Sequence, residues 1–446
     1  MSIQLRDYQQ TLYEKTRKAF RDGNRRVLVV APCGAGKTFL FAKMAENTVG
    51  EVLVLTHRRE LLRQTKELFD QNGIPARFSM VLTEANRLGQ YQRPKLIITD
   101  EAHLSRSNSW VKVLDYYDTF VCGFTATPIR LDGKPLGDIY DTLVQEVSVK
   151  WLIDHQRLAP YAYYAPTVVE TDDLRKHAGD FVIADMERLM CERAIYSDVL
   201  RTWERFGQGQ KTIAYCVSVK HAEATAKMFR DAGYPAVAID GNTPDKKREE
   251  IMAQFRAGAI RILCNVGIIS EGISIDDVCC CLLLRPTDSH ALFWQQAMRS
   301  MRYLPGKMAA IIDCVGNYTR NPLPDAEVSW SLSQTMKKKP VLNEHGNFFI
   351  RTCPKCFRAF KVAPVCPYCG EEYPLHPREI KAHKDIELAR ITAEEAKRAE
   401  QQRKQRRIEQ GAARTFPELV KLGKARGMKN PAAWAYHVMK GRNNYG

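Results

Sequence analysis

The sequence predicts an α/β protein with two parallel-sheet lobes in tandem, followed by a small zinc module and a basic helical tail. Three observations support this prediction. Segments with strand and helix patterns alternate through two long stretches, which is typical of parallel sheets covered by helices. A glycine-rich loop follows the first predicted strand, and two closely spaced cysteine pairs lie near the C-terminal end. We expect the four regions at 1–155, 156–330, 331–376 and 377–446.

The composition indicates a globular protein with a polyanionic partner. The 446 residues include 67 Lys plus Arg and 51 Asp plus Glu, which gives a formal net charge of +16. This balance favours nucleic acid as the partner. No stretch approaches the roughly 20 apolar residues of a membrane span, and the polar residues 1–6 lack the pattern of a signal peptide. We therefore expect a cytoplasmic protein without a membrane partner.

A phosphate-binding loop is predicted at residues 31–38, Ala-Pro-Cys-Gly-Ala-Gly-Lys-Thr, between an apolar strand-like run and a helix-like segment. Gly34 and Gly36 allow backbone N–H groups to turn toward phosphate oxygens. Lys37 can reach the β- and γ-phosphates, and the hydroxyl of Thr38 can ligate Mg²⁺. The loop therefore predicts nucleotide binding.

A glutamine upstream of the loop is a candidate for recognition of the base. We expect a helix over 4–22 that carries Gln9, whose amide can pair with the edge of an adenine. A single glutamine on a helix would carry no such meaning by itself. Its position just before the phosphate loop favours adenine recognition.

An acidic pair follows a later strand of the same predicted sheet. Strand-like runs at 51–55, 78–82 and 95–99 alternate with a helix-like segment, and the last run leads directly into Asp100 and Glu101. Ligands of parallel sheets gather at the carboxyl ends of the strands. Beside a phosphate loop, Asp100 would hold the Mg²⁺ shell and Glu101 would polarise the attacking water.

The next predicted strand, at 120–124, leads into Thr125-Ala126-Thr127-Pro128. Hydroxyl groups at this position could sense the hydrogen bonding of the acidic pair.

Together these motifs resemble those of superfamily 2 helicases of the DEAH-box kind. The resemblance rests on residues 31–38, on Asp100-Glu101-Ala102-His103 and on 125–128. It implies that the first motif takes the phosphates of ATP, the second takes Mg²⁺ and water, and the third couples hydrolysis to nucleic acid. His103, Thr125 and Thr127 would then be coupling residues. The segment 129–137 resembles bacterial RadD-type repair ATPases and the motor subunits of restriction enzymes.

The same resemblance assigns nucleic-acid contacts in the first lobe. Residues 56–61, Thr-His-Arg-Arg-Glu-Leu, match the first motif that contacts the nucleic-acid backbone, so Thr56 and Arg58 are candidates. Thr83 lies where the second such motif would be.

A second alternating region predicts a second lobe. After a crossing at 150–210 with a helix around 184–206, strand-like runs recur between 212 and 284. This region has no phosphate loop of its own. On a helix, Gln295, Arg299 and Arg302 would recur at i, i+4 and i+7 and share one face, which by itself can be a solvated stripe.

Downstream of the first lobe, these three residues resemble the arginine-finger motif of the family. The resemblance implies that Arg299 and Arg302 reach the γ-phosphate across the cleft. It also assigns Gly272 to the nucleotide site. Two departures affect this motif, because Met298 stands where the family has Gly and Ser274 where it has Asp. If 273–277 is extended, Asp276 shares a face with Ser274, and we hypothesise that it supplies the missing carboxylate.

Two CxxC pairs predict a metal site. Turns of this kind present two thiolates each, and together they suit a tetrahedral Zn²⁺. The alternatives are a disulfide pair or buried thiols. Disulfides are rare in cytoplasmic proteins. Four thiolates leave no open position for water, so the zinc would be structural. The four residues are Cys353, Cys356, Cys366 and Cys369.

The basic tail, with 17 Lys plus Arg against 8 Asp plus Glu over 378–446, is predicted to end in two short helices, the second over 430–439. Trp434 and Tyr436 could stack on bases, or they could be buried within a small helical hairpin. Replication or repair proteins are candidate partners of this tail.

The sequence therefore predicts an ATP-dependent nucleic-acid motor, a monomeric DNA helicase or translocase with ATP, Mg²⁺ and structural Zn²⁺. We expect stimulation by single-stranded or forked DNA and a role in DNA repair, recombination or replication. The alternatives are a translocase that remodels protein–DNA complexes without unwinding, an RNA helicase, and a non-catalytic binding scaffold. The intact Lys37, Glu101 and Arg299 argue against the scaffold.

Overall fold

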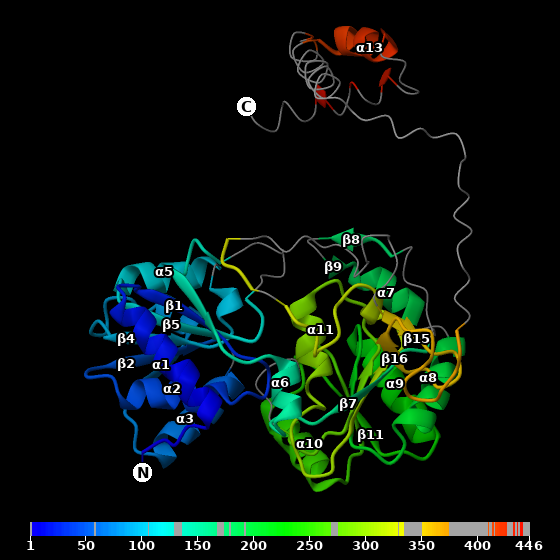
Figure 1. Ribbon diagram of the computed structural model, residues 1–446, viewed down its shortest axis with the longest axis horizontal. Helices are drawn as coiled ribbons and strands as arrows, with labels where there is room; N and C mark the ends of the chain where they lie inside the picture. Colours follow the sequence, from blue (N-terminus) through cyan, green and yellow to red (C-terminus); the bar gives the residue numbers. More distant parts are fainter. Residues whose placement is uncertain are drawn as a thin grey trace. The chain divides into compact units, whose positions relative to one another are not determined.

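The computed structural model (Figure 1) forms two compact units, Met1–Pro374 and Leu375–Gly446. Each unit is described by itself. The described residues are 2–57, 59–105, 107–128, 136–166, 174–177, 180–190, 193–268, 275–328, 330–333, 350–373, 409, 413, 415–425, 431–432, 435 and 438–439.

The first lobe of the larger unit contains a six-stranded sheet in the order β3-β2-β4-β5-β1-β6, and every neighbouring pair is parallel. All residues of β2 and β4 are buried, as expected for strands covered on both faces. The strands are β1 (Arg26–Val30), β2 (Val52–Thr56), β3 (Arg77–Met80), β4 (Leu96–Thr99), β5 (Phe120–Thr125) and β6 (Thr142–Gln145).

Helices cover both faces of this sheet. Leu12 of α1 packs with Val27 in one core, and Trp110 of α5 packs with Leu28 in the other. Successive residues of β1 therefore point to opposite layers. The helices of this lobe are α1 (Asp7–Arg21), α2 (Lys37–Glu46), α3 (Arg59–Gln71), α4 (Val81–Ala85) and α5 (Asn108–Tyr117), with a 3₁₀ turn at Ala102–Leu104.

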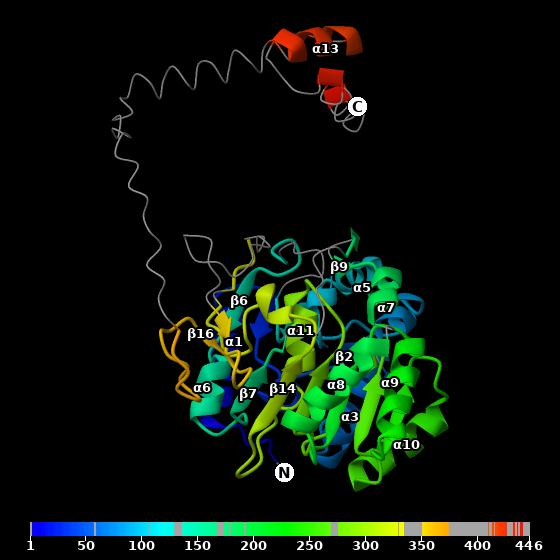
Figure 2. The same ribbon diagram turned by 90° about the vertical axis from the view of Figure 1, so that its right-hand side faces the viewer.

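The second lobe repeats this architecture with a parallel sheet in the order β11-β12-β10-β13-β14-β7. Figure 2 shows two neighbouring strands of this sheet, β14 and β7. Its last strand in this order, β7, comes first in the sequence and directly follows the crossing from the first lobe. The strands are β7 (Tyr161–Tyr164), β10 (Thr212–Tyr215), β11 (Ala236–Ile239), β12 (Ile262–Asn265), β13 (Cys280–Leu283) and β14 (Ala309–Asp313). The tandem pair of parallel-sheet lobes predicted from the sequence is confirmed.

Helices again lie on both faces. Trp203 of α8 packs with Ala214 on one side of the sheet, and Phe255 of α10 packs with Ile213 on the other. The helix expected around 184–206 is divided into α7 and α8. The helices are α6 (Val149–Asp154), α7 (Ile183–Met190), α8 (Arg193–Phe206), α9 (Val219–Asp231), α10 (Asp245–Ala257) and α11 (His290–Ala297), with a 3₁₀ turn at Asn317–Thr319 and a short hairpin of β8 (Lys176–His177) and β9 (Asp180–Phe181).

After the second sheet the chain returns to the first lobe. The indole of Trp294 lies 5.8 Å from that of Trp330 between ring centroids, and Trp330 also packs against the first-lobe core. The N–H of Gly137 donates to the carbonyl of Leu332 at 3.0 Å. The lobes are thus joined both by the crossing through α6 and by this return segment.

The cysteine pairs lie in a module that packs on the second lobe. An antiparallel pair, β15 (Ile350–Thr352) and β16 (Ala359–Lys361), frames it. The N–H of Ala165, just after β7, donates to the carbonyl of Phe357 at 3.0 Å. The ring of Phe357 lies 6.1 Å from that of Phe206. The module therefore extends the core of the second lobe at β7.

In the C-terminal unit the structure describes one helix, α13 (Phe416–Ala425), where the sequence predicts one. Residues 431–432, 435 and 438–439 are helical, in agreement with the second predicted tail helix. Trp434 and Tyr436 lie outside the described residues. Within the described part of the chain, none of the helices has the length and apolarity needed to cross a bilayer.

A buried polar cluster ties β3, α4 and α5 together. Glu84, with 1% of its surface exposed, accepts hydrogen bonds from Arg77 Nη1 and from the hydroxyl of Tyr117, each at 2.6 Å. Burial by itself would raise the pKa of Glu84, but the hydrogen bonds from Arg77 and Tyr117 outweigh it and lower the pKa.

We predict that Glu84→Ala lowers the free energy of unfolding of the first lobe by about 1.5 to 3 kcal/mol, because the half-buried Arg77 and the hydroxyl of Tyr117 lose this partner while Arg77 keeps its ion pair with Glu51. Because the pKa of Glu84 is lowered on folding, its stabilisation is complete above the unfolded pKa and is lost as the pH falls through the folded pKa. The difference between wild type and variant should therefore shrink in acid. Urea denaturation at several pH values measures it, with Asp70→Asn in the exposed Lys66–Asp70 pair as the control. Equal stability of wild type and Glu84→Ala at pH 7 would contradict the prediction.

Candidate active site

The phosphate loop joins β1 to α2 and is enclosed by neighbouring side chains. Gly34 and Gly36 have φ angles of +83° and +77°, in the left-handed region that favours glycine. A Cβ atom on Gly34 would lie 2.7 Å from Cδ2 of Leu158, and one on Gly36 would lie 2.4 Å from Nε2 of Gln9. The backbone conformation therefore favours glycine at both positions, whereas the two close contacts are with the ends of side chains that can move.

A cavity of about 640 Å³ is lined by residues of this loop and by other residues of both lobes. Lys37 and Thr38 face it from the start of α2, and the acidic pair faces it from the end of β4. Arg299 and Arg302 face it from the second lobe. The lining residues are Gln4, Arg6, Gln9, Cys33, Gly34, Gly36, Lys37, Thr38, Phe39, Leu61, Gln64, Asp100, Glu101, Asp276, Met298, Arg299 and Arg302.

Glu101 is held in an unusual backbone conformation at the end of β4. Its φ is +50°, in the left-handed region, which costs about 1 to 2 kcal/mol for a residue with a side chain. Its N–H donates to Oδ1 of Asp100 at 2.9 Å, and both side chains are buried. Such a conformation places the two carboxyl groups at the tip of the strand, facing the cavity.

A chain of polar contacts connects Glu101 to the end of β5. Nδ1 of His103 lies 3.3 Å from Oε2 of Glu101 and 3.2 Å from Oγ1 of Thr125. The hydroxyl of Thr125 also donates to the carbonyl of Thr127 at 2.9 Å. The three residues predicted to couple hydrolysis to nucleic acid thus form a chain of polar contacts that ends at Glu101.

The carboxyl group of Glu101 stays ionised at neutral pH. Burial alone would raise its pKa, but the hydrogen bond and the charge of His103, together with the charge of Lys37, hold the pKa below its usual range. A buried carboxylate can accept a hydrogen bond from a water molecule and orient it.

The second-lobe residues differ from the single helical face that the sequence predicts. Helix α11 ends at Ala297, and Arg299 lies in the turn that follows. Arg302 is extended and pairs with the main chain of Leu158. The predicted helical face is therefore wrong for both arginines, because the helix ends before them, although both line the same cavity.

Gln295 lies apart from the two arginines. Its side chain is buried and lines a small cavity of about 30 Å³, which Thr127 of the first lobe also lines. Met298, which stands where the family has glycine, lines both cavities and is buried. Its φ is −76°, so the backbone does not require glycine there.

Asp276 lies in a turn rather than in an extended segment, and its carboxylate contacts Arg302. Its Oδ1 is 3.1 Å from Nη1 of Arg302. Ser274 and Gly272, the other predicted residues of this segment, lie outside the described residues.

A second, basic cleft of about 820 Å³ lies between α3 and α10. It shares Gln64 with the cavity of about 640 Å³ at the phosphate loop. An ion pair crosses between the lobes at this cleft, with Arg63 Nη1 2.9 Å from Glu249 Oε1. The charged and histidine side chains that line it are His57, Arg59, Arg63, Asp245, Arg248, Glu249 and Arg256.

Sequence reasoning missed Arg63, Arg248 and Arg256. The available signal for Arg248 was the run of basic residues at the start of α10, and Arg63 lies on α3 without such a signal. Of the predicted nucleic-acid contacts, Thr56 is buried at the end of β2 next to this cleft, Thr83 is exposed on α4, and Arg58 lies outside the described residues.

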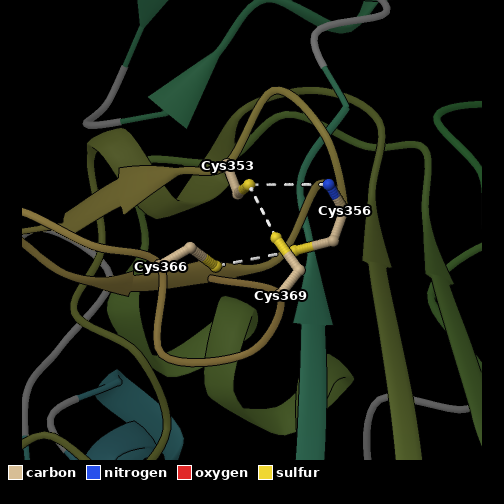
Figure 3. A group of neighbouring side chains, drawn as sticks. All are labelled: Cys353, Cys356, Cys366 and Cys369. Atoms are coloured by element: carbon tan, nitrogen blue, oxygen red, sulfur yellow. Dashed lines mark hydrogen bonds between the residues drawn. The ribbon is translucent and has the colours of Figure 1, made fainter. Parts of the chain in front are cut away.

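The four cysteines of the module converge on one point (Figure 3). Their sulfur atoms all lie within 4.8 Å of one another. Sγ of Cys353 is 3.5 Å from Sγ of Cys369, and Sγ of Cys356 is 3.7 Å from Sγ of Cys366. These separations are far above the length of about 2.05 Å for a disulfide bond, and they suit sulfurs around a tetrahedral Zn²⁺ with bonds of about 2.3 Å.

Known families match both lobes. Residues 2–87 and 77–130 match the family "Type III restriction enzyme, res subunit", and residues 194–304 match "Helicase conserved C-terminal domain". The two matches lie in the order that the motifs predict.

Two individual proteins have sequences similar to that of this chain. A 51.5 kDa protein of Lactococcus phage (isolate 7-9) is 36% identical over 380 residues, which cover 83% of each chain. IRC3 of Saccharomyces cerevisiae, named as an ATP-dependent helicase, is 30% identical over 355 residues, 70% of this chain and 51% of that protein. The chain thus spans about half the length of the yeast relative.

A solved structure has a similar fold. A fragment assigned as an HsdR subunit of a type I restriction enzyme from Vibrio vulnificus YJ016 superposes with a TM-score of 0.57 at 19% identity, covering 71% of this chain and 66% of that one. With ATP-site motifs on two facing lobes, and with matches to the restriction-enzyme res-subunit family and the helicase C-terminal family, the chain belongs to helicase superfamily 2 and is a nucleic-acid-dependent ATPase related to restriction-enzyme motor subunits.

Proposed function

We propose that this protein is a DNA-stimulated ATPase that moves along DNA by opening and closing the cleft between its lobes. One observation carries the proposal. The phosphate loop and acidic pair of the first lobe share a single cavity with two arginines of the second lobe. Hydrolysis in such a site depends on how the lobes are placed, which allows a motor to couple it to movement.

In the proposed mechanism, the phosphate loop binds the triphosphate and Lys37 neutralises its β- and γ-phosphates. Thr38 and Asp100 offer a hydroxyl and a carboxylate to the same cavity, and such oxygen ligands suit Mg²⁺, which would neutralise charge on the phosphates. Glu101 orients the attacking water. Arg299 and Arg302 stabilise the charge that develops on the transferred phosphoryl group.

The proposed track for DNA is the basic cleft between α3 and α10. Arg59, Arg63 and Arg248 line it, and guanidinium groups bind phosphate oxygens well. DNA is favoured over RNA by the likeness to restriction enzymes, whose motors the family match names. The net charge of +16 supports a polyanionic partner.

We further propose a monomeric motor that acts on single-stranded or forked DNA in repair, recombination or replication. The resemblance of 129–137 to RadD-type ATPases supports this role, and residues 129–135 of that stretch lie outside the described residues. The basic tail is the proposed contact for replication or repair proteins.

The cysteine module is proposed to hold a structural Zn²⁺. The convergence of four sulfur atoms within 4.8 Å supports it. The module packs against β7 and α8 through Phe357, so the ion would also support this edge of the second lobe.

Lys37→Ala should lower ATP turnover by roughly 100-fold or more, because the phosphates lose their main counter-charge. Glu101→Gln should lower it by roughly 10² to 10⁴ while ATP still binds, because only the orientation of water is lost. Steady-state ATPase assays with single-stranded DNA, forked DNA, RNA and no polymer measure both effects. Turnover that no polymer stimulates would defeat the proposed function. Stimulation by RNA alone would defeat the choice of DNA, and wild-type activity of Lys37→Ala would defeat the assigned site.

Asp276→Asn should lower DNA-stimulated turnover by roughly threefold to tenfold, because Arg302 loses a charged partner that orients it. Asp277→Asn is the matched control, since the neighbouring carboxylate pairs with Lys211 instead. Unchanged turnover in Asp276→Asn, or an equal loss in both variants, would argue against an orienting role.

Cys356→Ser and Cys366→Ser should each abolish the binding of about one zinc ion per chain and lower the melting temperature, because metal binding contributes directly to folding of such modules. Metal analysis and thermal denaturation measure these effects. Cys279→Ser, at a half-buried cysteine outside the cluster, is the control. A purified wild-type chain without zinc, or full zinc content in both variants, would contradict the assignment.

A further inference from the structure

Lys307 is a buried lysine on a loop of the second lobe whose neighbouring side chains are exposed. It exposes 9% of its surface, whereas Tyr303, Leu304 and Met308 expose between 36% and 51%. Lysine is almost never buried without a partner, and apolar residues are the usual occupants of buried positions. This inversion of the usual pattern indicates that the ammonium group of Lys307 has a specific use inside the protein.

The partner of this ammonium group is the main chain of Asp276. Nζ of Lys307 donates a hydrogen bond to the carbonyl oxygen of Asp276 at 2.8 Å. Burial lowers the pKa of Lys307, so keeping its charge at this position costs free energy. A hydrogen bond from a charged donor is stronger than one from a neutral donor and offsets part of that cost. Lys307 therefore anchors the turn at 276–277, which lies just before β13.

The side chain of the anchored residue contacts one of the two arginines of the cavity at the phosphate loop. Oδ1 of Asp276 lies 3.1 Å from Nη1 of Arg302, and both residues line this cavity. The side chain of Asp276 is largely exposed, so the place of its carboxylate depends on where the main chain of the turn lies. Lys307 controls that main chain through the carbonyl group of the same residue.

Arg302 and Lys307 belong to one loop that is closed at its base. The main chain of Arg302 pairs with Leu158, and the N–H of Ala309 donates to the carbonyl of Pro160 at 2.8 Å. Both ends of the loop are therefore held by the crossing between the lobes. From this fixed base, one cation contacts the carboxylate of an aspartate and the other contacts its carbonyl group.

We infer that Lys307 is a positioning residue for Arg302, because it fixes the turn at 276–277 from which the carboxylate of Asp276 directs the guanidinium group into the cavity. The inference rests on the proposed role of Arg302 in ATP hydrolysis. Lys307 itself lies outside the lining of the cavity, so its effect on turnover passes through Asp276.

The test measures DNA-stimulated ATP turnover of Lys307→Met, which keeps the apolar stem of lysine and removes the donor. We expect kcat to fall by roughly threefold to tenfold while KM changes by less than about twofold, because Arg302 is proposed to act on the charge of the transition state. A loss confined to kcat is not the expected sign of a weakened nucleotide site.

Lys211→Met is the matched control. Lys211 exposes 6% of its surface, donates to the carbonyl of Arg256 at 2.9 Å, and pairs with the side chain of Asp277. It is thus a second buried lysine that contacts the same turn, but at the residue that faces away from Arg302. We expect its kcat to stay within about twofold of wild type even if its melting temperature falls.

A double-mutant cycle separates positioning from a general loss of stability. In the Asp276→Asn background, Lys307→Met should lower kcat by less than about twofold, because the carboxylate through which it acts is already absent. A purely structural loss would instead lower kcat by the same factor in both backgrounds.

Three results would overturn the inference: unchanged kcat in Lys307→Met, an equal loss in both backgrounds of the cycle, or an equal loss in Lys211→Met. Melting temperatures show whether the variants fold. A Lys307→Met chain that fails to fold where Lys211→Met folds would assign Lys307 a structural role and would also overturn it. A wild-type protein whose turnover DNA does not stimulate would instead defeat the proposed function.

Discussion

The two halves of the ATP cavity belong to different lobes, and one residue of the crossing between them contacts both. The main chain of Leu158 pairs with Arg302, and the N–H of the next residue, Ala159, donates to the carbonyl of Met301 at 2.8 Å. The side chain of Leu158 fills the space beside Gly34 in the phosphate loop. Because Leu158 lies between α6 and β7, a rotation of the second lobe must alter the contact with the loop, the contact with Arg302, or both. The geometry of the catalytic cavity is therefore linked to the lobe arrangement through covalent structure as well as through surface contacts.

The order of strands in the first sheet places the remaining parts of the site next to one another. β5 lies between β1 and β4 in the sheet, although it follows both in the sequence. The phosphate loop after β1, the threonines after β5 and the acidic pair after β4 therefore emerge side by side at one edge. His103 uses this proximity, because its ring contacts both Glu101 and Thr125. A parallel sheet with another strand order would separate these groups.

The parts that local sequence could predict are those whose signals lie within a few residues. The strand, glycine loop and helix around Lys37 are one such signal, and so are the acidic pair after β4 and the two CxxC pairs. Their elements and relative placement follow from periodicity and from the topology of parallel sheets. The predictions were less complete where distant residues decide the outcome. Helix α11 ends at Ala297, and the chain beyond it pairs with the crossing segment at Arg302, a pairing that no local pattern indicates.

The same limit applies to contacts between the lobes. The return of the chain through Trp330 to the first-lobe core, and the ion pair of Arg63 with Glu249, join residues that are far apart in sequence. Spacing rules describe neighbours on one helix or strand, so they contain no information on such pairs. Gln9 illustrates the point within one lobe, because its hydrogen bond to the carbonyl of Ala35 joins residues 26 positions apart, and its contact with adenine stays a prediction.

The exposure of Asp276 suits its contact with Arg302, which we propose also contacts a phosphate of the nucleotide. The side chain of Asp276 is 66% exposed, and that of Arg302 is 29% exposed. Ion pairs this close to solvent contribute little net stability, because water screens both charges. The pair can therefore hold the guanidinium of Arg302 near the cavity without binding it so strongly that a phosphoryl group could not compete. A buried carboxylate at this position would hold the arginine more firmly, and a serine alone would not carry the charge needed to orient it.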